Sequence, residues 1–179
     1  MKFVKITLMA TMAICIAMSS CKKNKDNENN PTRFTKTINT SNGLTIELSW
    51  KVGNHDDGQN YADLDLYADD TTRSLINPYE YSSTSGNSTE SFNINDNATA
   101  GTYFIGVKYA GFETGTTSGD AKYTIKIYPQ GNAGDATTLT RTLSDDFEGN
   151  NKAYSRYKLT KAGTTYTIEE LSDDLVFNY

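Results

Sequence analysis

The chain has 179 residues, with 22 acidic and 17 basic side chains and a formal net charge of −5 at pH 7. Nucleic-acid binders need clustered Lys and Arg to neutralise phosphates, so an acidic chain whose body has no basic run is a poor candidate for that class. One histidine cannot supply the clustered His and Cys ligands of a zinc site. The length is enough for one domain with a single core.

The first 20 residues have the order of a secretory signal peptide. Two lysines precede an apolar stretch from Ile6 to Met18, and two serines then precede Cys21. This stretch has about 13 residues, fewer than the roughly 20 that a membrane-spanning helix needs. We therefore expect a cleavable signal over residues 1–20, whose removal takes away two lysines and lowers the net charge from −5 to −7.

The junction Met18-Ser19-Ser20-Cys21 resembles the lipobox of bacterial lipoproteins, with Met where Leu is usual. The resemblance implies cleavage before Cys21 and its lipidation with acyl chains such as palmitate. Two or three chains bury enough methylenes, at about 0.8 kcal/mol each, for stable membrane attachment. An ordinary secreted protein and an uncleaved anchor are the alternatives.

The next segment, residues 21–33, contains Cys21 and then no large apolar side chain, which predicts a flexible tether. It is similar to lipoproteins of the Bacteroidota phylum, in which a Lys- and acid-rich stretch after the lipidated cysteine directs export to the cell surface. This implies an outer-membrane lipoprotein of the cell envelope. Because Asp26 and Glu28 come late in the segment, the periplasmic and outer-surface orientations both stay open.

Residues 34–179 are expected to form one all-β domain. Apolar and polar side chains alternate with a period of two, as in half-buried strands, over residues 44–52, 62–68, 103–109 and 123–127. Weaker patterns cover residues 89–94, 136–143, 154–160 and 164–169, and the long loops are 53–61, 77–88 and 110–120. About eight strands without a helical period predict an antiparallel β-sandwich of jelly-roll type.

An acidic cluster follows the first of these loops. Asp63 and Asp65 alternate with leucines, so both point away from the core about 7 Å apart. Asp56 and Asp57 arrive from the preceding loop and would complete an oxygen-rich cage of the kind that Ca²⁺ prefers. The alternative is a solvated acidic face that keeps a sheet edge soluble.

Three motifs carry a family resemblance: Trp50, then ADLDLY at residues 62–67, then GTYFIGV at residues 101–107. Together they are similar to the bacterial pre-peptidase C-terminal domain, a jelly-roll sandwich appended to secreted proteases and other exported proteins. Some of its members bind Ca²⁺ or insoluble matrix. The resemblance implies an accessory or binding module and leaves its ligand open.

Catalysis lacks the residues that it needs. His55 is the single histidine, and both cysteines lie within residues 1–21, so a nucleophile with a base would depend on one loop side chain. We expect a protein that is not an enzyme. Among the twelve tyrosines, Tyr67 faces outward in the alternation, and Tyr79 and Tyr81 lie in a loop, where flat rings could stack on sugars. The alternative is that tyrosine serves only as a good strand residue.

These observations predict a cell-envelope lipoprotein with a non-catalytic binding or adhesion module, stabilised by calcium. Its partners would be a membrane, through the lipid anchor, and an extracellular glycan or protein. An alternative is a glycan-binding accessory lipoprotein of a nutrient-uptake system, for which Trp50 would be a further aromatic candidate, although its register points inward. A purely structural envelope protein is a third hypothesis.

Overall fold

The computed structural model describes residues 34–55, 61–70, 82–83, 89–111, 119–145 and 152–178. Within these ranges the chain forms ten strands and one 3-10 helix, η2 (Ala133–Asp135). The strands are β1 (Thr35–Asn39), β2 (Leu44–Val52), β3 (Asp63–Asp70), β4 (Ser82–Ser83), β5 (Thr89–Ile94), β6 (Gly101–Gly111), β7 (Ala121–Pro129), β8 (Thr137–Leu143), β9 (Lys152–Ala162) and β10 (Thr165–Asn178). The described part of the chain has no helix long and apolar enough to cross a membrane.

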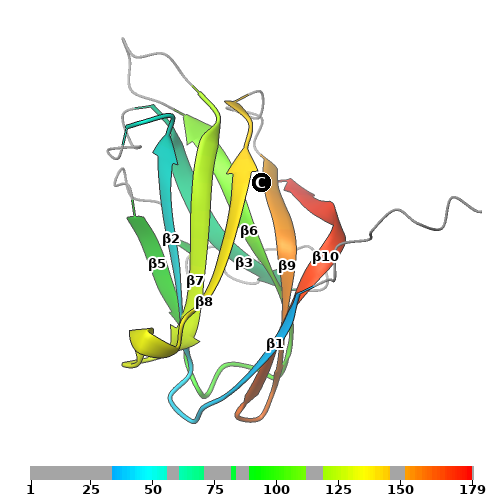
Figure 1. Cartoon of the computed structure of the whole chain (residues 1–179). Helices are drawn as coiled ribbons and strands as arrows, with labels where there is room; N and C mark the ends of the chain where they lie inside the picture. The colour runs from blue at the N-terminus through cyan, green and yellow to red at the C-terminus, as the bar shows by residue number, and fades with distance from the viewer. Residues whose placement is uncertain are drawn as a thin grey trace, which may run out of the picture. The chain divides into compact units, whose positions relative to one another are not determined.

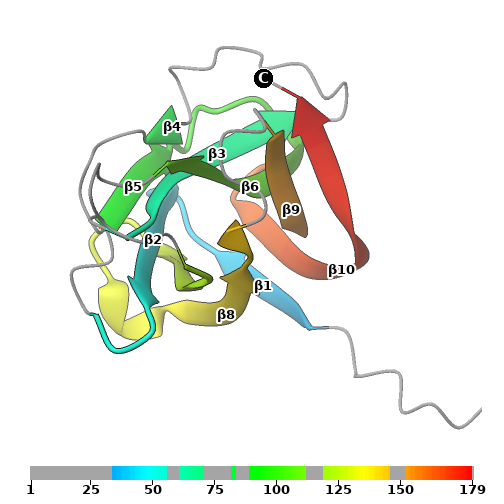
Figure 2. The same ribbon diagram turned by 90° about the horizontal axis from the view of Figure 1, so that it is seen from above.

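The strands form two antiparallel sheets that face each other (Figures 1 and 2). The larger sheet has six strands in the order β1-β10-β9-β6-β3-β4, and the smaller has four in the order β5-β2-β7-β8. The predicted all-β sandwich is confirmed, with ten strands in the described ranges in place of about eight. The jelly-roll topology stays a prediction.

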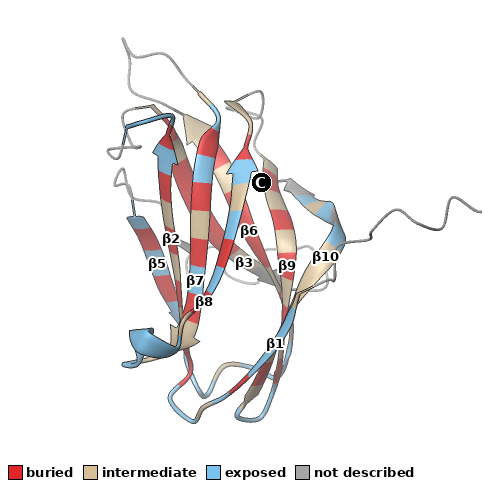
Figure 3. Cartoon of the chain, in the orientation of Figure 1, coloured by how far each residue is buried: buried red, intermediate tan, exposed pale blue. Residues whose placement is uncertain are grey.

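Alternating side chains build the core between the sheets. In β2 the residues Leu44, Ile46, Leu48 and Trp50 are buried, while the residues between them are partly exposed. Figure 3 shows the same alternation of buried and more exposed residues along β5, β7 and β8. Burying one large apolar side chain stabilises a protein by about 1.5–3 kcal/mol, so these rows fix which face of each strand points inward.

Two strands were not predicted. β1 buries only Ile38, at the edge of the larger sheet where it pairs with β10, and β4 has two residues. Neither segment is long or regular enough to show a two-residue period. Both were missed because a short strand at the edge of a sheet leaves almost no pattern in the sequence.

β9 and β10 both depart from regular pairing at one place. Tyr157 of β9 pairs with Glu170 of β10, but Ser155 pairs with Leu175, so residues 171–174 have no partner across the ladder. On the other side of β9, Ile105 and Gly106 pair with Tyr157 and Ser155, which leaves Arg156 outside the ladder as well. Bulges of this kind bend strands and redirect side chains, and β10 changes direction in Figures 1 and 2.

Candidate functional site

The start of β3 is fixed by hydrogen bonds from aromatic side chains. The indole Nε1 of Trp50 donates to the carbonyl of Ala62 at 2.6 Å. The hydroxyl of Tyr109 lies 3.0 Å from the carbonyl of Tyr61 and 3.1 Å from that of Gly119. Trp50 is 5% exposed, so it is a core residue, as its register predicted, and it offers no open ring to a ligand.

The loop that precedes β3 is flanked by two aromatic side chains, His55 and Tyr61, whose rings stack on each other. Gly53, with φ +57°, allows a tight turn in which the amide of His55 donates to the carbonyl of Val52. The rings of His55 and Tyr61 then stack with centroids 4.1 Å apart and planes at 19°. Asp56 and Asp57, which lie between these two residues in the chain, are outside the described residues, and their predicted role as metal ligands is untested.

Asp63 and Asp65 share the outer face of β3, as the alternation predicted, but Asp65 is only 7% exposed. The hydroxyl of Tyr67 donates to Asp65 Oδ2 at 3.1 Å. Asp63 Oδ1 is buried and accepts no hydrogen bond within the described ranges. A third acid, Glu90 of β5 in the other sheet, is 1% exposed and adds its charge to the electrostatics of both aspartates.

This surrounding favours the neutral forms of both carboxyl groups. Burial, with smaller contributions from the charges of Asp63 and Glu90, raises the pKa of Asp65 to about 6, although the Tyr67 hydrogen bond and Lys108 act in the opposite direction. Burial and then the charge of Glu90 raise the pKa of Asp63. Either a proton or a bound cation would reduce the free-energy cost of burying these negative charges close to one another.

The described residues do not form a complete metal site by themselves. They contain no group of three or more His, Cys, Asp or Glu side chains placed to hold one ion. Asp63 and Asp65 supply two carboxylates, and the uncompensated Asp63 Oδ1 suits a hard cation. Ca²⁺ takes six to eight oxygens, so a site here would need further ligands, such as Asp56, Asp57, backbone carbonyls or water.

The predicted exposure of the Tyr67 ring is wrong. Tyr67 does lie on the outer face of the sheet, but it is 7% exposed because it packs with Ala153, Phe104 and Leu175 in a second small apolar cluster. Its neighbour across the ladder is Gly106, which has no side chain and leaves room for the ring. Tyr79 and Tyr81, the other proposed sugar-stacking residues, lie outside the described residues.

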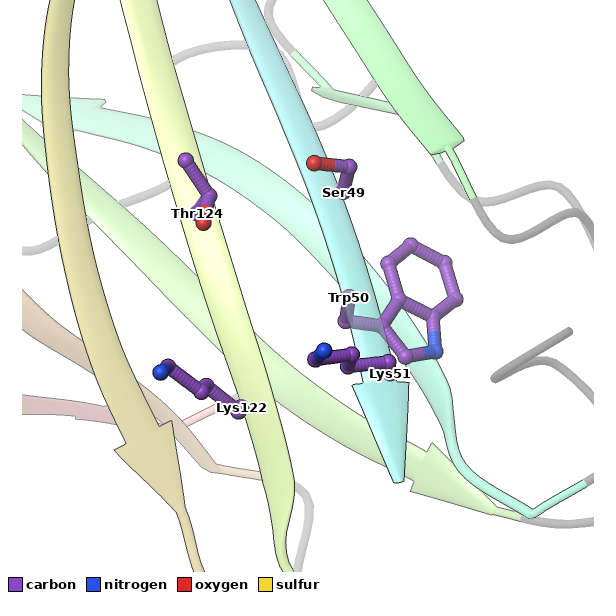
Figure 4. Close-up of a pocket in the computed structure, with 5 residues that line it drawn as sticks. All are labelled: Ser49, Trp50, Lys51, Lys122 and Thr124. Carbon is purple, nitrogen blue, oxygen red and sulfur yellow. The ribbon is translucent and has the colours of Figure 1, made fainter. Parts of the chain in front are cut away.

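A shallow depression of about 180 Å³ lies on the outer face of the smaller sheet. Figure 4 shows Ser49 and Lys51 of β2 beside Thr124 and Lys122 of β7, while the indole of Trp50 points away from them. Lys51 and Lys122 pair directly across the two strands, and both are exposed. Solvent screens such an exposed pair, so it offers a bound anion little electrostatic gain.

A second pocket, of about 230 Å³, lies where β9 and β10 bulge. Arg156 and Asp174 come from the two bulged segments, and the edge strand β8 supplies Arg141. The remaining lining residues are Tyr123, Thr142, Leu143 and Tyr154. Sequence analysis missed this site because a bulge interrupts the two-residue period, and the only signal was a pair of arginines in weakly patterned strands.

Two ion pairs and two buried tyrosines set the electrostatics around this pocket. Arg156 Nη1 lies 3.2 Å from Asp174 Oδ1, and Arg141 pairs with Glu170. The Arg141 guanidinium also lies 5.9 Å from the centre of the Tyr157 ring. Burial raises the pKa of Tyr123 and of Tyr157, so both phenols stay protonated and can donate hydrogen bonds.

We compared the chain with protein-family models, with curated proteins and with solved structures, and none of the three comparisons found a match.

Proposed function

We propose that the protein is a lipoprotein of the bacterial cell envelope, anchored to the outer membrane through Cys21, whose sandwich is a non-catalytic binding or adhesion module. The observation that carries the binding role is the burial of Asp65 and Glu90, with Asp63 beside them, on rigid strands. Burying charges costs stability, and proteins keep such arrangements mainly at functional sites. The similarity of residues 62–67 and 101–107 to the pre-peptidase C-terminal domain supports the same role.

The anchor is tested by replacing its proposed lipid acceptor. We expect Cys21→Ala to move the protein from the detergent phase to the aqueous phase when cells are extracted and the phases separated, because the acyl chains rather than an apolar helix hold it. Ser20→Ala, which keeps a small residue before the cysteine, serves as the control and should stay in the detergent phase. A Cys21→Ala protein that still enters the detergent phase would show that the uncleaved apolar stretch is the anchor.

Calcium at the acidic cluster is the second part of the proposal. A Ca²⁺ ion beside Asp63 and Asp65 would compensate both carboxylates, so the folded state should be stabilised by mass action. At ten times the dissociation constant the gain is about 1.4 kcal/mol, or a rise of about 3–6 °C in Tm for a domain of this size.

The measurement is a melting curve at pH 7 in millimolar Ca²⁺ and in Na⁺ at matched ionic strength. The double variant Asp63→Asn with Asp65→Asn should melt at the same temperature in both salts, and the exposed Asp96→Asn should respond as the wild type does. If the wild type melts at the same temperature in the two salts, the cluster does not bind Ca²⁺ specifically. It is then an acidic surface on which any salt screens the repulsion between the carboxylates.

A further inference from the structure

The pocket at the bulges of β9 and β10 is formed by both sheets and opens to solvent. Its lining residues come from β7 and the edge strand β8 of the smaller sheet and from β9 and β10 of the larger one. The side chains of its three charged residues, Arg141, Arg156 and Asp174, are 39%, 31% and 52% exposed. A ligand can therefore reach these charged groups without any change in the fold.

Among the described lining residues, Tyr123 is the polar one that is almost completely buried, at 6% exposed. Its hydroxyl makes no hydrogen bond within the described ranges, yet it is not one of the side-chain oxygens closed to solvent. Arg141, Arg156 and Asp174 all act on its pKa, so the hydroxyl lies close to the charged groups of the pocket. The hydroxyl of Tyr157 differs, because it is closed to solvent and Tyr157 does not line the pocket. The hydroxyl that faces the pocket as a donor is therefore that of Tyr123.

The two guanidinium groups also keep donors for a ligand. Arg156 pairs with Asp174 through one nitrogen, Nη1, at 3.2 Å. Arg141 pairs with Glu170. A guanidinium carries five N–H donors, so neither ion pair uses all of them. Since a hydroxyl held away from bulk water without an acceptor destabilises the folded state, the pocket favours a ligand that brings acceptor oxygens to Tyr123 and to a guanidinium.

The charges around the pocket favour a carboxylate over a dianion. Asp174 and Glu170 already balance the two arginines, so a phosphate dianion would meet about twice the repulsion that a monoanion meets. A carboxylate spreads one charge over two coplanar oxygens, which suits the planar edge of a guanidinium. The ring of Tyr154 and the side chain of Leu143 offer apolar surface to a short carbon chain. The volume of about 230 Å³ is below the roughly 300 Å³ at which drug-sized pockets begin, so the ligand is small.

We propose that this pocket binds the carboxylate of a small organic acid, which accepts hydrogen bonds from the Tyr123 hydroxyl and from the Arg156 guanidinium. Tyr123 belongs to β7 and Arg156 to β9, so the bound acid would connect the two sheets. The inference goes beyond the proposed function, because the pocket shares no residue with the acidic cluster of β3 and is a separate site.

The test is an NMR titration of the detergent-solubilised full chain with butyrate, followed through the Nε–H signals of Arg141 and Arg156. The comparison probes are butyramide, which has the same shape without the charge, and inorganic phosphate at matched ionic strength. We expect butyrate to shift both signals saturably, and each comparison probe to bind at least about tenfold more weakly, as for the loss of one charge-assisted hydrogen bond. Equal binding of butyramide would show a simple apolar cavity, equal binding of phosphate would show an unselective anion site, and either result overturns the proposal.

Two variants locate the ligand. Tyr123→Phe removes only the hydroxyl and should weaken butyrate binding by about tenfold. Arg156→Lys keeps the charge but loses the planar edge, so it should have a similar effect, measured on the Arg141 signal. Tyr166→Phe is the matched control and should bind as the wild type does, because its hydroxyl also has no partner in the described ranges but is closed to solvent and outside the pocket. Melting curves verify that all three variants fold.

Two further results contradict the assignment. Butyrate that causes no saturable shift of the two arginine signals at up to about 100 mM would show that the pocket has no useful affinity for a carboxylate. Binding that Tyr123→Phe and Arg156→Lys leave unchanged would place the ligand elsewhere on the protein. Neither result affects the anchor, which the Cys21 partition experiment tests, or the calcium site, which the melting curves in the two salts test.

Discussion

Replacing Trp50 by alanine is expected to lower the free energy of unfolding by about 3–5 kcal/mol. The substitution removes a large buried ring, leaves a cavity between the sheets, and deprives the carbonyl of Ala62 of its hydrogen bond. Urea unfolding followed by circular dichroism measures the loss, because the variant has no tryptophan left for fluorescence.

The control for this experiment is Val176→Ala. Val176 is 38% exposed, so its truncation should change the free energy of unfolding by less than about 0.5 kcal/mol. A Trp50→Ala protein as stable as this control would mean that the indole does not hold the sheets together. Trp50 would then return as a candidate for stacking on a sugar.

At pH 7 and with a chelator present, Asp65→Asn is expected to raise the free energy of unfolding by about 2 kcal/mol. The pKa of Asp65 is about 6 in the folded protein, against about 3.9 for an unperturbed aspartate in an unfolded chain. The folded state therefore binds more protons between these two pH values, so the wild type loses stability as the pH rises through this window. Asparagine has no charge to bury and can still accept the hydrogen bond from Tyr67.

The gain should disappear at low pH. Below about pH 3.5 the carboxyl group is protonated in both states, and wild type and variant should unfold at the same urea concentration. Trp50 fluorescence follows both transitions, and Asp96→Asn, at an exposed position, should show no such difference between the two pH values. An Asp65→Asn protein that is less stable than the wild type at pH 7 would show that the ionised carboxylate has a stabilising partner in the fold.

The sequence predicted the strands whose two faces differ in polarity. β2, β5 and β7 alternate over their whole length because one face meets the core and the other meets solvent. The weak pattern at the position of β10 covered only residues 164–169. The structure continues the strand to Asn178 after a bulge that no two-residue period can reveal.

The candidate sites were predictable only where they depend on one strand. The common face of Asp63 and Asp65 follows from alternation within β3. The proximity of Glu90 to these aspartates and the burial of Tyr67 cannot be predicted in this way, because each depends on strands that are distant in the sequence. The pocket around Arg156 was out of reach for the same reason, since it exists only when bulged β9 and β10 lie beside β8.

The place of β1 has a mechanical consequence. β1 is the first strand after the proposed anchor, so with Cys21 lipidated as proposed, a force that pulls the sandwich away from the membrane would act on this strand first. Only five residue pairs join β1 to β10, and Ile38 is its one buried side chain. Under such tension β1 should separate from β10 first, which would lengthen the chain between Cys21 and the remaining sheet by up to about 17 Å at roughly 3.4 Å per residue. The pairing of β10 with β9 would remain, so the rest of the larger sheet and the pocket at its bulges would keep their structure.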